Sequence, residues 1–279
     1  MILVKLLLSI VFICNVYASA DENCPDVGSL LPKKNESMVK DLVTALPNLL
    51  EITKFDLQGN QKFCDNPIGK ATVTIYLSRT YLPLTKKDDR VKVVSDKNVP
   101  LHCPGSDKDI YLSKENMRDI KMQGSGRIKC SEDRYLLLSH QKGGKFKDSG
   151  SWWGRGASGG SAIPFRMIAV DTNKIKLGSV VYIPSMKGIE FTLENGTKIV
   201  HDGFFFAGDI GGRVKGLKID IMLGDPSDED KQNTLNKIAK AGEVQDDKLQ
   251  ICLVNDQKII DKLRKMHKKA YRKGYKTSP

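Results

Sequence analysis

The sequence predicts a mainly β chain, built around a compact barrel with an inserted smaller region and flanking helices. The main observation is a series of short segments with apolar residues at alternate positions and glycine turns between them, as in barrel strands. With 279 residues and 40% hydrophobic content, the chain suffices for one large globular domain or two modest ones, which excludes collagen-like, coiled-coil and wholly disordered structures. The expected strands are Ala71–Tyr76, Arg166–Asp171, Ser179–Pro184, Gly203–Asp209, Leu217–Leu223 and a last one ending near Val254.

Residues 1–20 have the three parts of a secretory signal peptide. Lys5 precedes an apolar run over residues 6–14, and the small residues 18–20 follow it. A membrane-retained helix is the alternative, although the run is shorter than the ~20 residues that span a bilayer. We therefore expect cleavage after Ala20 and an exported protein, periplasmic or secreted.

The charge balance narrows the class of partner. Residues 1–20 contain one lysine and no acid, so the net charge of +12 becomes +11 after cleavage. A basic exported protein is drawn to anionic surfaces such as cell-wall polymers, lipid headgroups and acidic polysaccharides. Export makes a nucleic acid partner unexpected.

Five cysteines would remain after cleavage. Their spread through an exported chain predicts one or two long-range disulfides and one thiol left over, with the pairing open. No two of them have the close spacing of a zinc knuckle, so we expect structural disulfides and no metal. The five are Cys24, Cys64, Cys103, Cys130 and Cys252.

The segments around the barrel differ in character. Residues 21–57 have apolar positions at three- and four-residue intervals, which indicates an amphipathic helix interrupted by Pro47. Residues 85–150 are more polar and predict a loosely structured insertion or a small second domain, with its clearest strand beginning at Tyr135. The barrel would then comprise residues 70–84 and 160–255.

Two helical features follow the central strands. Ser227 stands three residues before Asp230, a capping-box-like start for a helix running to about Ala241. Residues 256–279 form a basic tail whose lysines and arginines are interleaved with apolar residues. Such a helix can lie on anionic wall or membrane material, or pack on the barrel through its apolar stripe.

Three aspartates are the strongest candidates for chemistry, because each has apolar neighbours on an expected strand: Asp171, Asp209 and Asp220. A carboxylate buried there is costly unless it is hydrogen-bonded, paired or protonated. Burial and a second carboxylate both raise a carboxyl pKa, and a general acid must still be protonated near neutral pH. The alternative is that they face solvent or bind the backbone of a turn.

A glycine-rich segment, residues 149–160, contains the only two tryptophans, Trp152 and Trp153. Its glycines allow the backbone to approach a ligand closely. The indole rings suit stacking on sugar rings and equally suit anchoring a loop, so both roles stay open. His201 is expected at the surface, because no serine or cysteine motif completes a triad with it.

The sequence around the aspartates also has a specific spacing. Asp209 is followed by Gly211, Gly212, a Lys215-Gly216 pair and then Asp220, eleven residues after the first aspartate. Together with IAVDT at 168–172 and LGSVVYIP at 177–184, this resembles the three-aspartate (3D) domain of bacterial cell-wall enzymes, which is similar to the barrel of MltA-type lytic transglycosylases. The resemblance covers about a fifth of the chain, and its interval between the first two aspartates is longer than in the smallest members.

The resemblance implies a double-psi β-barrel that brings Asp209 and Asp220 together. It implies a peptidoglycan lytic transglycosylase, a lyase that cleaves the MurNAc-GlcNAc β-1,4 bond and forms 1,6-anhydroMurNAc. The substrate's own C6 hydroxyl is then the nucleophile, so one residue, Asp220, can act as acid and then as base. Asp209 and Asp171 would orient it, although coupling could place the proton on Asp209.

By the same resemblance, Gly211, Gly212 and Lys215 belong to the substrate site, where Lys215 would contact the muramyl carboxylate or peptide; a solvated lysine is the alternative. We expect peptidoglycan glycan strands as the partner, no cofactor and a monomer. Two other functions remain open. One is a non-catalytic barrel that binds the cell wall, and the other is a hydrolase of another polysaccharide, which needs a second carboxylate at glycosidase spacing.

Overall fold

The computed structural model describes residues 63–64, 67–83, 90–131, 134–194, 196, 198–242 and 248–268. All of them lie in the compact unit formed by Leu49–Pro279. The expected signal peptide, the helix expected within 21–57, Cys24 and the tail after Lys268 lie outside the described residues.

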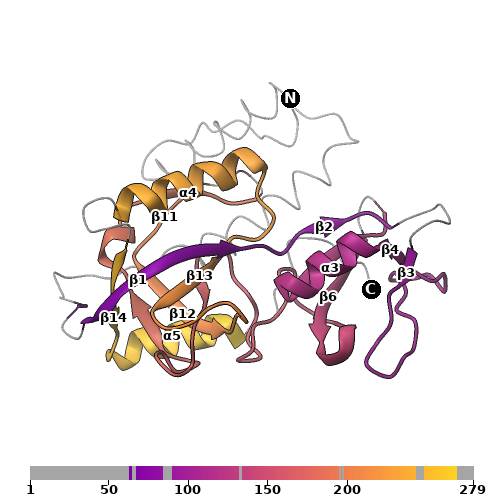
Figure 1. Ribbon diagram of the computed structural model, residues 1–279, viewed down its shortest axis with the longest axis horizontal. Coiled ribbons are helices and arrows are strands. Elements are labelled where there is room, and N and C mark those ends of the chain that lie inside the picture. The colour runs from indigo at the N-terminus through magenta and orange to yellow at the C-terminus, as the bar shows by residue number, and fades with distance from the viewer. Residues whose placement is uncertain are drawn as a thin grey trace, which may run out of the picture. The chain divides into compact units, whose positions relative to one another are not determined.

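Six strands close into a barrel in the order β1-β13-β8-β12-β9-β14 (Figure 1). β1 pairs with β13 and β8 with β12 in parallel, and the other neighbours are antiparallel. Parallel neighbours cannot be joined by a tight hairpin, so the chain has to cross between strands far apart in sequence. The predicted mainly β barrel is confirmed. Its strands are β1 (Pro67–Tyr76), β8 (Met167–Ala169), β9 (Val180–Tyr182), β12 (Phe204–Asp209), β13 (Lys218–Met222) and β14 (Leu249–Leu253).

The barrel interior is filled by alternate residues of its strands. On β13, Ile219 and Ile221 point into the core while Asp220 between them is only half-buried. Each fully buried aliphatic side chain contributes about 1.5–3 kcal/mol, so this alternation fixes which face of each strand is turned inward. Other core members on these strands are Ile168, Val181, Phe205, Ala207, Leu249 and Ile251.

Helix α4 (Asp228–Gly242) adds Ile238 to the barrel core. Its start has the predicted capping contacts: Ser227 Oγ accepts a hydrogen bond from the Asp230 amide (3.0 Å) and donates one to the Asp230 carboxylate (2.7 Å). The predicted helix and its start are therefore confirmed.

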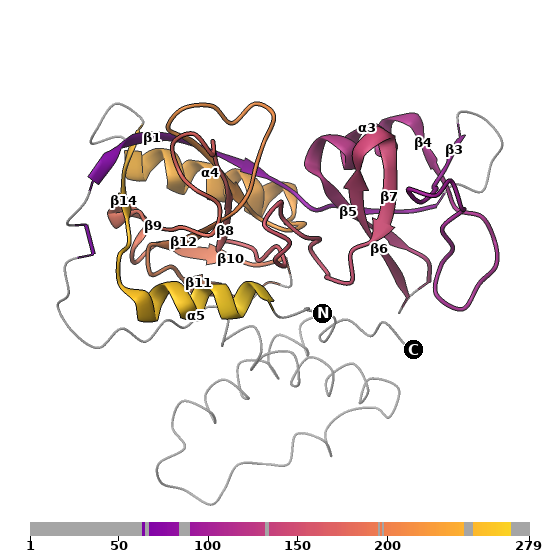
Figure 2. The ribbon, with the colours of Figure 1, turned by 90° about the horizontal axis from the view of Figure 1, so that it is seen from below.

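Helix α5 (Gln257–Lys268) packs on the outside of the barrel beside β9 (Figure 2). Ile259, Leu263 and Met266 are buried in a cluster with residues of β9 and β12. The apolar stripe is thus covered by the barrel, and only the basic side of α5 is left for solvent or a partner. No helix of the described residues is long and apolar enough to cross a membrane.

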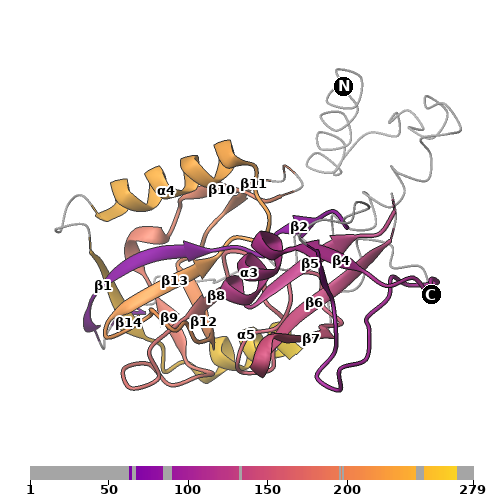
Figure 3. The same cartoon turned by 45° about the vertical axis from the view of Figure 1, so that its right-hand side comes forward.

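The region between β1 and the glycine-rich segment contains a four-stranded sheet in the order β2-β5-β6-β7, with helix α3 packed against it (Figure 3). It has its own core, which includes Leu112, Ile120, Ile128 and Phe146. Its elements are β2 (Thr80–Tyr81), β3 (Arg90–Lys92), β4 (Tyr111–Ser113), α3 (Lys114–Gln123), β5 (Ser125–Lys129), β6 (Tyr135–Gln141), η3 (Lys142–Gly144) and β7 (Lys145–Asp148).

Sequence reasoning missed α3 because the helix is mostly polar and buries only Met117 and Ile120. Local capping defines its ends: Ser113 Oγ accepts a hydrogen bond from the Asn116 amide, and Gly124 ends it in a left-handed conformation. It also missed the hairpin of β10 (Glu190–Thr192) and β11 (Lys198–Val200), and the short η4 (Pro184–Met186).

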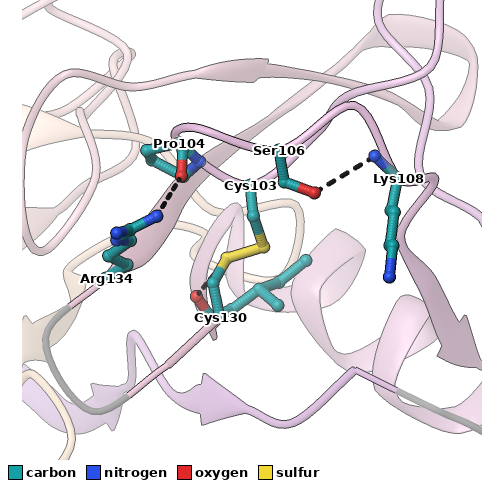
Figure 4. Close-up of a disulfide and its surroundings, with 7 residues drawn as sticks. Cys103, Pro104, Ser106, Lys108, Cys130 and Arg134 are labelled. Atoms are coloured by element: carbon teal, nitrogen blue, oxygen red, sulfur yellow. Dashed lines mark hydrogen bonds between the residues drawn. A yellow bond between two sulfur atoms is a disulfide. The ribbon is translucent and has the colours of Figure 1, made fainter.

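Two disulfides join the described cysteines, none of which is free. Cys64 is bonded to Cys252, with 5.2 Å between their Cα atoms, and ties the approach to β1 onto β14 across 188 residues of sequence. Cys103 is bonded to Cys130 across 27 residues. Figure 4 shows that second disulfide beside the hydrogen bond from Arg134 to the Pro104 carbonyl.

The Cys64–Cys252 bond should stabilise the barrel strongly, because it closes a long loop of the unfolded chain. We expect Cys64→Ser combined with Cys252→Ala to lower the free energy of unfolding by about 2–5 kcal/mol, measured by urea denaturation. Replacing Cys103 and Cys130 in the same way is the matched control and should cost less. Equal losses for the two pairs would contradict this account.

Candidate active site

Asp209 and Asp220 lie on either side of one small residue. Strand β8 runs between β12 and β13, and its Ala169 is opposite Asp209 on one side and Asp220 on the other. Residues directly opposite across neighbouring strands share a face of the sheet. The two carboxylates therefore stand at one level on one face of the barrel wall, with only a methyl group between them.

A β-bulge at Gly208 puts Asp209 on that face. Ala207 is opposite Ile168, but Ala169 is opposite Asp209, so Gly208 is an extra residue in β12. Ala207 points into the core, and strict alternation would turn Asp209 inward as well. The extra residue moves Asp209 to the outer face, where Asp220 stands. Glycine leaves room there for Met167, whose methyl carbon would lie 2.5 Å from an added Cβ and would have to move.

Asp209 is held by backbone amides. Its Oδ1 accepts hydrogen bonds from Ala157 and Ile210, both at 2.9 Å. Burial raises the pKa of Asp209, and these two amides oppose that rise. Ala157 belongs to the glycine-rich segment, whose Ser158 amide also bonds to the Gly208 carbonyl at 2.9 Å. The segment therefore approaches β12 closely, and the close approach to a ligand that its glycines predict stays a prediction.

Asp220 has a different environment. Its Oδ1 is buried and accepts no hydrogen bond from any described residue. The ammonium group of Lys218 lies 3.8 Å from that oxygen. Burial raises the pKa of Asp220, and the charge of Lys218 partly offsets the rise. A carboxyl group with a raised pKa, whose buried oxygen accepts no hydrogen bond from any described residue, is suited to holding a proton.

Tyr76 at the end of β1 is a third member of the site, which sequence reasoning had placed in a strand but not among the functional residues. Its ring packs with Trp152, Trp153 and Met222 on the outer face of the barrel wall. Its hydroxyl is buried and has no aligned hydrogen-bond partner among the described residues, and its pKa is raised well above the usual value by burial and then by the charges of Asp209 and Asp220. The alternation of inward-facing and outward-facing residues along β1 was the sequence signal that could have placed Tyr76 on the face of the acids.

Asp171 is hydrogen-bonded to the loop between β12 and β13. One carboxylate oxygen accepts from the Gly216 amide at 2.8 Å and the other from the Asn173 amide at 3.0 Å. These bonds lower the pKa of Asp171, so its environment is the opposite of that of Asp209 and Asp220. Asp171 therefore fixes the loop that carries Lys215, and its hydrogen bonds within the described part of the chain do not join it to the other two carboxylates.

The remaining residues expected at the substrate site lie on this loop. Lys215 and Gly212 are exposed, as a solvated lysine and a substrate contact would both allow. Gly211 is required by packing, since an added Cβ would lie 2.4 Å from the Val214 side chain. The same added Cβ at Gly211 would lie 3.8 Å from Oδ2 of Asp220, so this glycine is next to one of the two acids.

The two tryptophans anchor a loop. Both are buried, with 5% of each residue exposed, so neither ring offers an open face to a sugar. Trp152 donates from its indole nitrogen to Glu194 at 2.6 Å, and the Arg127 guanidinium lies 4.3 Å over its ring. These contacts fit the loop-anchoring role, which is one of the two roles left open by the sequence.

Arg127 is the centre of a buried ion-pair network that sequence reasoning missed. Its guanidinium donates to both oxygens of Glu194, at 3.1 and 3.2 Å, and to Asp225 at 3.2 Å. Burial alone would raise the pKa of Glu194, but Arg127 and the other donors outweigh it and lower the pKa. The network ties β5 of the four-stranded sheet to loops of the barrel and to Trp152.

The expectation of a surface His201 is wrong. The ring is buried, donates from Nε2 to the Phe165 carbonyl (2.6 Å) and accepts at Nδ1 from the Gly203 amide (2.8 Å). Burial, and secondarily the charge of Arg166, lowers the pKa of His201 to about 4. It is a neutral structural histidine whose tautomer is set by its backbone partners.

Comparison with known proteins gives a match to one family model and several similar solved structures. Residues 166–242 match the family model of the 3D domain. The chain contains a 3D domain. That domain supplies β8, β9, β12 and β13, and with them Asp171, Asp209 and Asp220.

Among solved structures, the chain is similar to *Escherichia coli* MltA with bound chitohexaose, at 15% identity and a TM-score of 0.40, covering 67% of this chain and 71% of that one. A membrane-bound lytic murein transglycosylase from *Agrobacterium tumefaciens* matches at 14% identity and a TM-score of 0.41, over 90% and 92%. The lytic transglycosylase LtgG of *Burkholderia pseudomallei* matches at 15% and 0.34, over 65% and 70%. No curated protein sequence matches the chain.

The raised pKa of Asp220 gives a stability test with a defined sign. A carboxyl group whose pKa is higher in the folded chain stabilises fully at low pH, and that stabilisation is lost as pH rises through the folded pKa. We therefore expect Asp220→Asn to raise the Tm by a few degrees at pH 7, with the gain vanishing near pH 4, as measured by calorimetry.

The matched control is Asp171→Asn, which should behave in the opposite way. Its pKa is lowered in the folded chain, so the substitution should lower the Tm at pH 7, and the deficit should shrink as the pH falls. The same sign of change for both variants would show that their environments do not differ as described.

Proposed function

We propose that this protein is a peptidoglycan lytic transglycosylase, which cleaves the β-1,4 bond between MurNAc and GlcNAc and forms 1,6-anhydroMurNAc. The observation that carries the proposal is the pair of carboxylates in the 3D domain pattern, Asp209 and Asp220, held on one face with raised pKa values. A binding module has no need to hold two acids in so costly an environment.

The contacts of the two carboxylates support different roles. Asp209 receives two backbone amides on Oδ1, which stabilise its ionised form. The buried Oδ1 of Asp220 receives none from the described residues. Hydrogen-bond donors favour the ionised form of a carboxyl group, so we assign the proton, and with it the role of general acid, to Asp220, whose charge is offset, among the described residues, by Lys218 alone.

The reaction then needs no external nucleophile. Asp220 gives its proton to the glycosidic oxygen as the bond from that oxygen to C1 of MurNAc breaks. The C6 hydroxyl of the same ring attacks C1, and its proton passes to the Asp220 carboxylate, which restores the acid. Ionised Asp209 stabilises the positive charge that develops on the ring in the transition state. Asp171 holds the neighbouring loop in place, a positioning role.

The partner and location follow from charge and cysteines. The proposed substrate is the glycan strand of the cell wall, reached by an exported, disulfide-bonded and basic protein. We further propose that the exposed basic side of α5, together with the residues that follow it, adds electrostatic attraction to anionic wall or membrane material.

Substitution of the two acids tests the function directly. Wild type should release fragments with anhydromuramyl ends from purified sacculi, detected by mass spectrometry. Asp220→Asn should reduce that rate about 100-fold or more, because the swap is isosteric and removes only proton transfer. Asp209→Asn should also reduce it, by about two orders of magnitude, through lost charge stabilisation.

Sacculus binding by both variants serves as the control for folding, and it should stay near that of wild type. Activity of Asp220→Asn within a few-fold of wild type would contradict its assignment as the acid. Wild type that binds sacculi without cleaving them would be a wall-binding barrel, and reducing MurNAc ends would identify a hydrolase.

The role of the basic tail can be separated from the chemistry. Truncation after Lys268 removes four basic residues while keeping α5 and its packing: Lys269, Arg272, Lys273 and Lys276. We expect weaker sacculus binding at low salt, a smaller difference at high salt, and unchanged cleavage of short soluble glycans. Equal binding by the two proteins at both salt concentrations would contradict a targeting role.

A further inference from the structure

We propose that His267, at the end of helix α5, is a positioning residue of the active site, because it holds the base of a hairpin whose tip donates a backbone amide to Asp209. This inference rests on the proposed function and extends it by a residue that lies outside the 3D domain.

The hairpin is formed by the end of the glycine-rich segment and the two residues after it, and we call it the 154–162 hairpin. Two backbone hydrogen bonds of 3.0 Å join its arms, from the Ala162 amide to the Gly154 carbonyl and from the Gly156 amide to the Gly160 carbonyl. At its tip, the Ala157 amide donates to Oδ1 of Asp209 at 2.9 Å. Because its arms are bonded to each other, the position of that amide depends on what holds the base of the hairpin.

His267 holds the base through two hydrogen bonds to Ser161. The Ser161 amide donates to the His267 carbonyl, and Nδ1 of the His267 ring is bonded to the Ser161 carbonyl, both at 2.7 Å. A carbonyl oxygen can only accept, so Nδ1 is the nitrogen that carries the proton. The other ring nitrogen, Nε2, is buried and has no hydrogen-bond partner among the described residues. The ring therefore bonds to the hairpin through Nδ1.

The same ring also supports the strand that carries Asp209. It stacks on Phe206 of β12, with 4.4 Å between the ring centroids and 20° between the planes. The Phe206 ring lies in turn against the bulge, since a Cβ added to Gly208 would lie 3.0 Å from Cδ1 of Phe206. His267 is therefore linked to Asp209 by two routes, one through the 154–162 hairpin and one through the bulge that turns Asp209 outward.

Helix α5 is itself fixed to the barrel, as such a support requires. His267 is fully buried, and Leu263 one turn earlier is buried in the cluster between α5 and the barrel. Between them, the Arg264 guanidinium donates to the Gly178 carbonyl at 3.2 and 3.3 Å. The Gly178 amide is bonded to the Ala207 carbonyl, next to the bulge, at 2.8 Å. The last turns of α5 thus contact both neighbours of the bulge region.

The consequence for the chemistry concerns the charge on Asp209. The Ala157 amide is one of two amides that favour the ionised form of this carboxylate. In the proposed reaction, ionised Asp209 stabilises the positive charge of the transition state. His267 thus maintains the environment of Asp209 without contacting a reacting atom.

The test compares two substitutions of His267. His267→Phe keeps a ring to stack on Phe206 and removes the donor, whereas His267→Asn keeps a donor at the position of Nδ1. In His267→Phe, hydrogen exchange of the Ala157 amide, measured by NMR, should be about tenfold faster than in wild type. On soluble glycan strands, kcat should fall about tenfold because the Asp209 environment is less well fixed. His267→Asn should restore both toward wild type.

Ile259→Val is the matched control, since Ile259 is buried under the first turn of the same helix. It should lower stability and leave Ala157 exchange and kcat near those of wild type. Unchanged Ala157 exchange or unchanged kcat in His267→Phe would overturn the inference, as would equal effects of the Phe and Asn variants. Exchange that responds as expected, in a protein whose wild type yields no anhydromuramyl ends, would support the link from His267 to Asp209 and contradict the proposed function instead.

Discussion

Two carboxylates held on either side of one alanine lose much of their contact with water, so the surrounding structure has to fix them in place. The closed barrel does this through strand pairing: β8 is bonded on one side to the strand of Asp209 and on the other to the strand of Asp220. A shift of one residue in either register would turn an acid into the apolar core. The register of three neighbouring strands is therefore the constraint on which the site depends.

The second support comes from outside the barrel. The amide of Ala157 that binds Asp209 lies in a segment anchored through Trp152, which is held in turn by Glu194 and Arg127. Arg127 lies on β5, so the four-stranded sheet contributes to the environment of an acid that it does not touch. Removing one partner of a buried ion pair typically costs about 3–5 kcal/mol of stability. The Arg127–Glu194 pair is therefore a strong link between the four-stranded sheet and the segment that binds Asp209.

Much of the fold was predictable because local patterns determine it. The barrel strands have strong apolar alternation, and Ser227 and Asp230 form a cap within four residues. The candidate acids were predictable from their apolar neighbours on expected strands, and from the resemblance of the segment Asp209–Asp220 to the 3D domain. Helix α3 was missed because its polar sequence relies on caps and two buried side chains.

The remaining features depend on contacts between residues far apart in sequence. The bulge at Gly208 exists only in relation to β8, and simple alternation would have placed Asp209 inside the barrel. His201 and Arg127 are polar residues that become buried because partners from other segments satisfy them. Cysteine spacing likewise left the pairing open, since Cys64 and Cys252 meet only when β1 and β14 pair.

The most direct measurement of the central claim is digestion of sacculi in water enriched in oxygen-18, followed by mass spectrometry of the new MurNAc ends. If the nucleophile is the C6 hydroxyl of the substrate and Asp220 accepts its proton, the new ends should be 1,6-anhydro and should carry no oxygen-18. Reducing ends that contain oxygen-18 would show that water attacks C1, and would contradict the assignment of a single acid with an internal nucleophile.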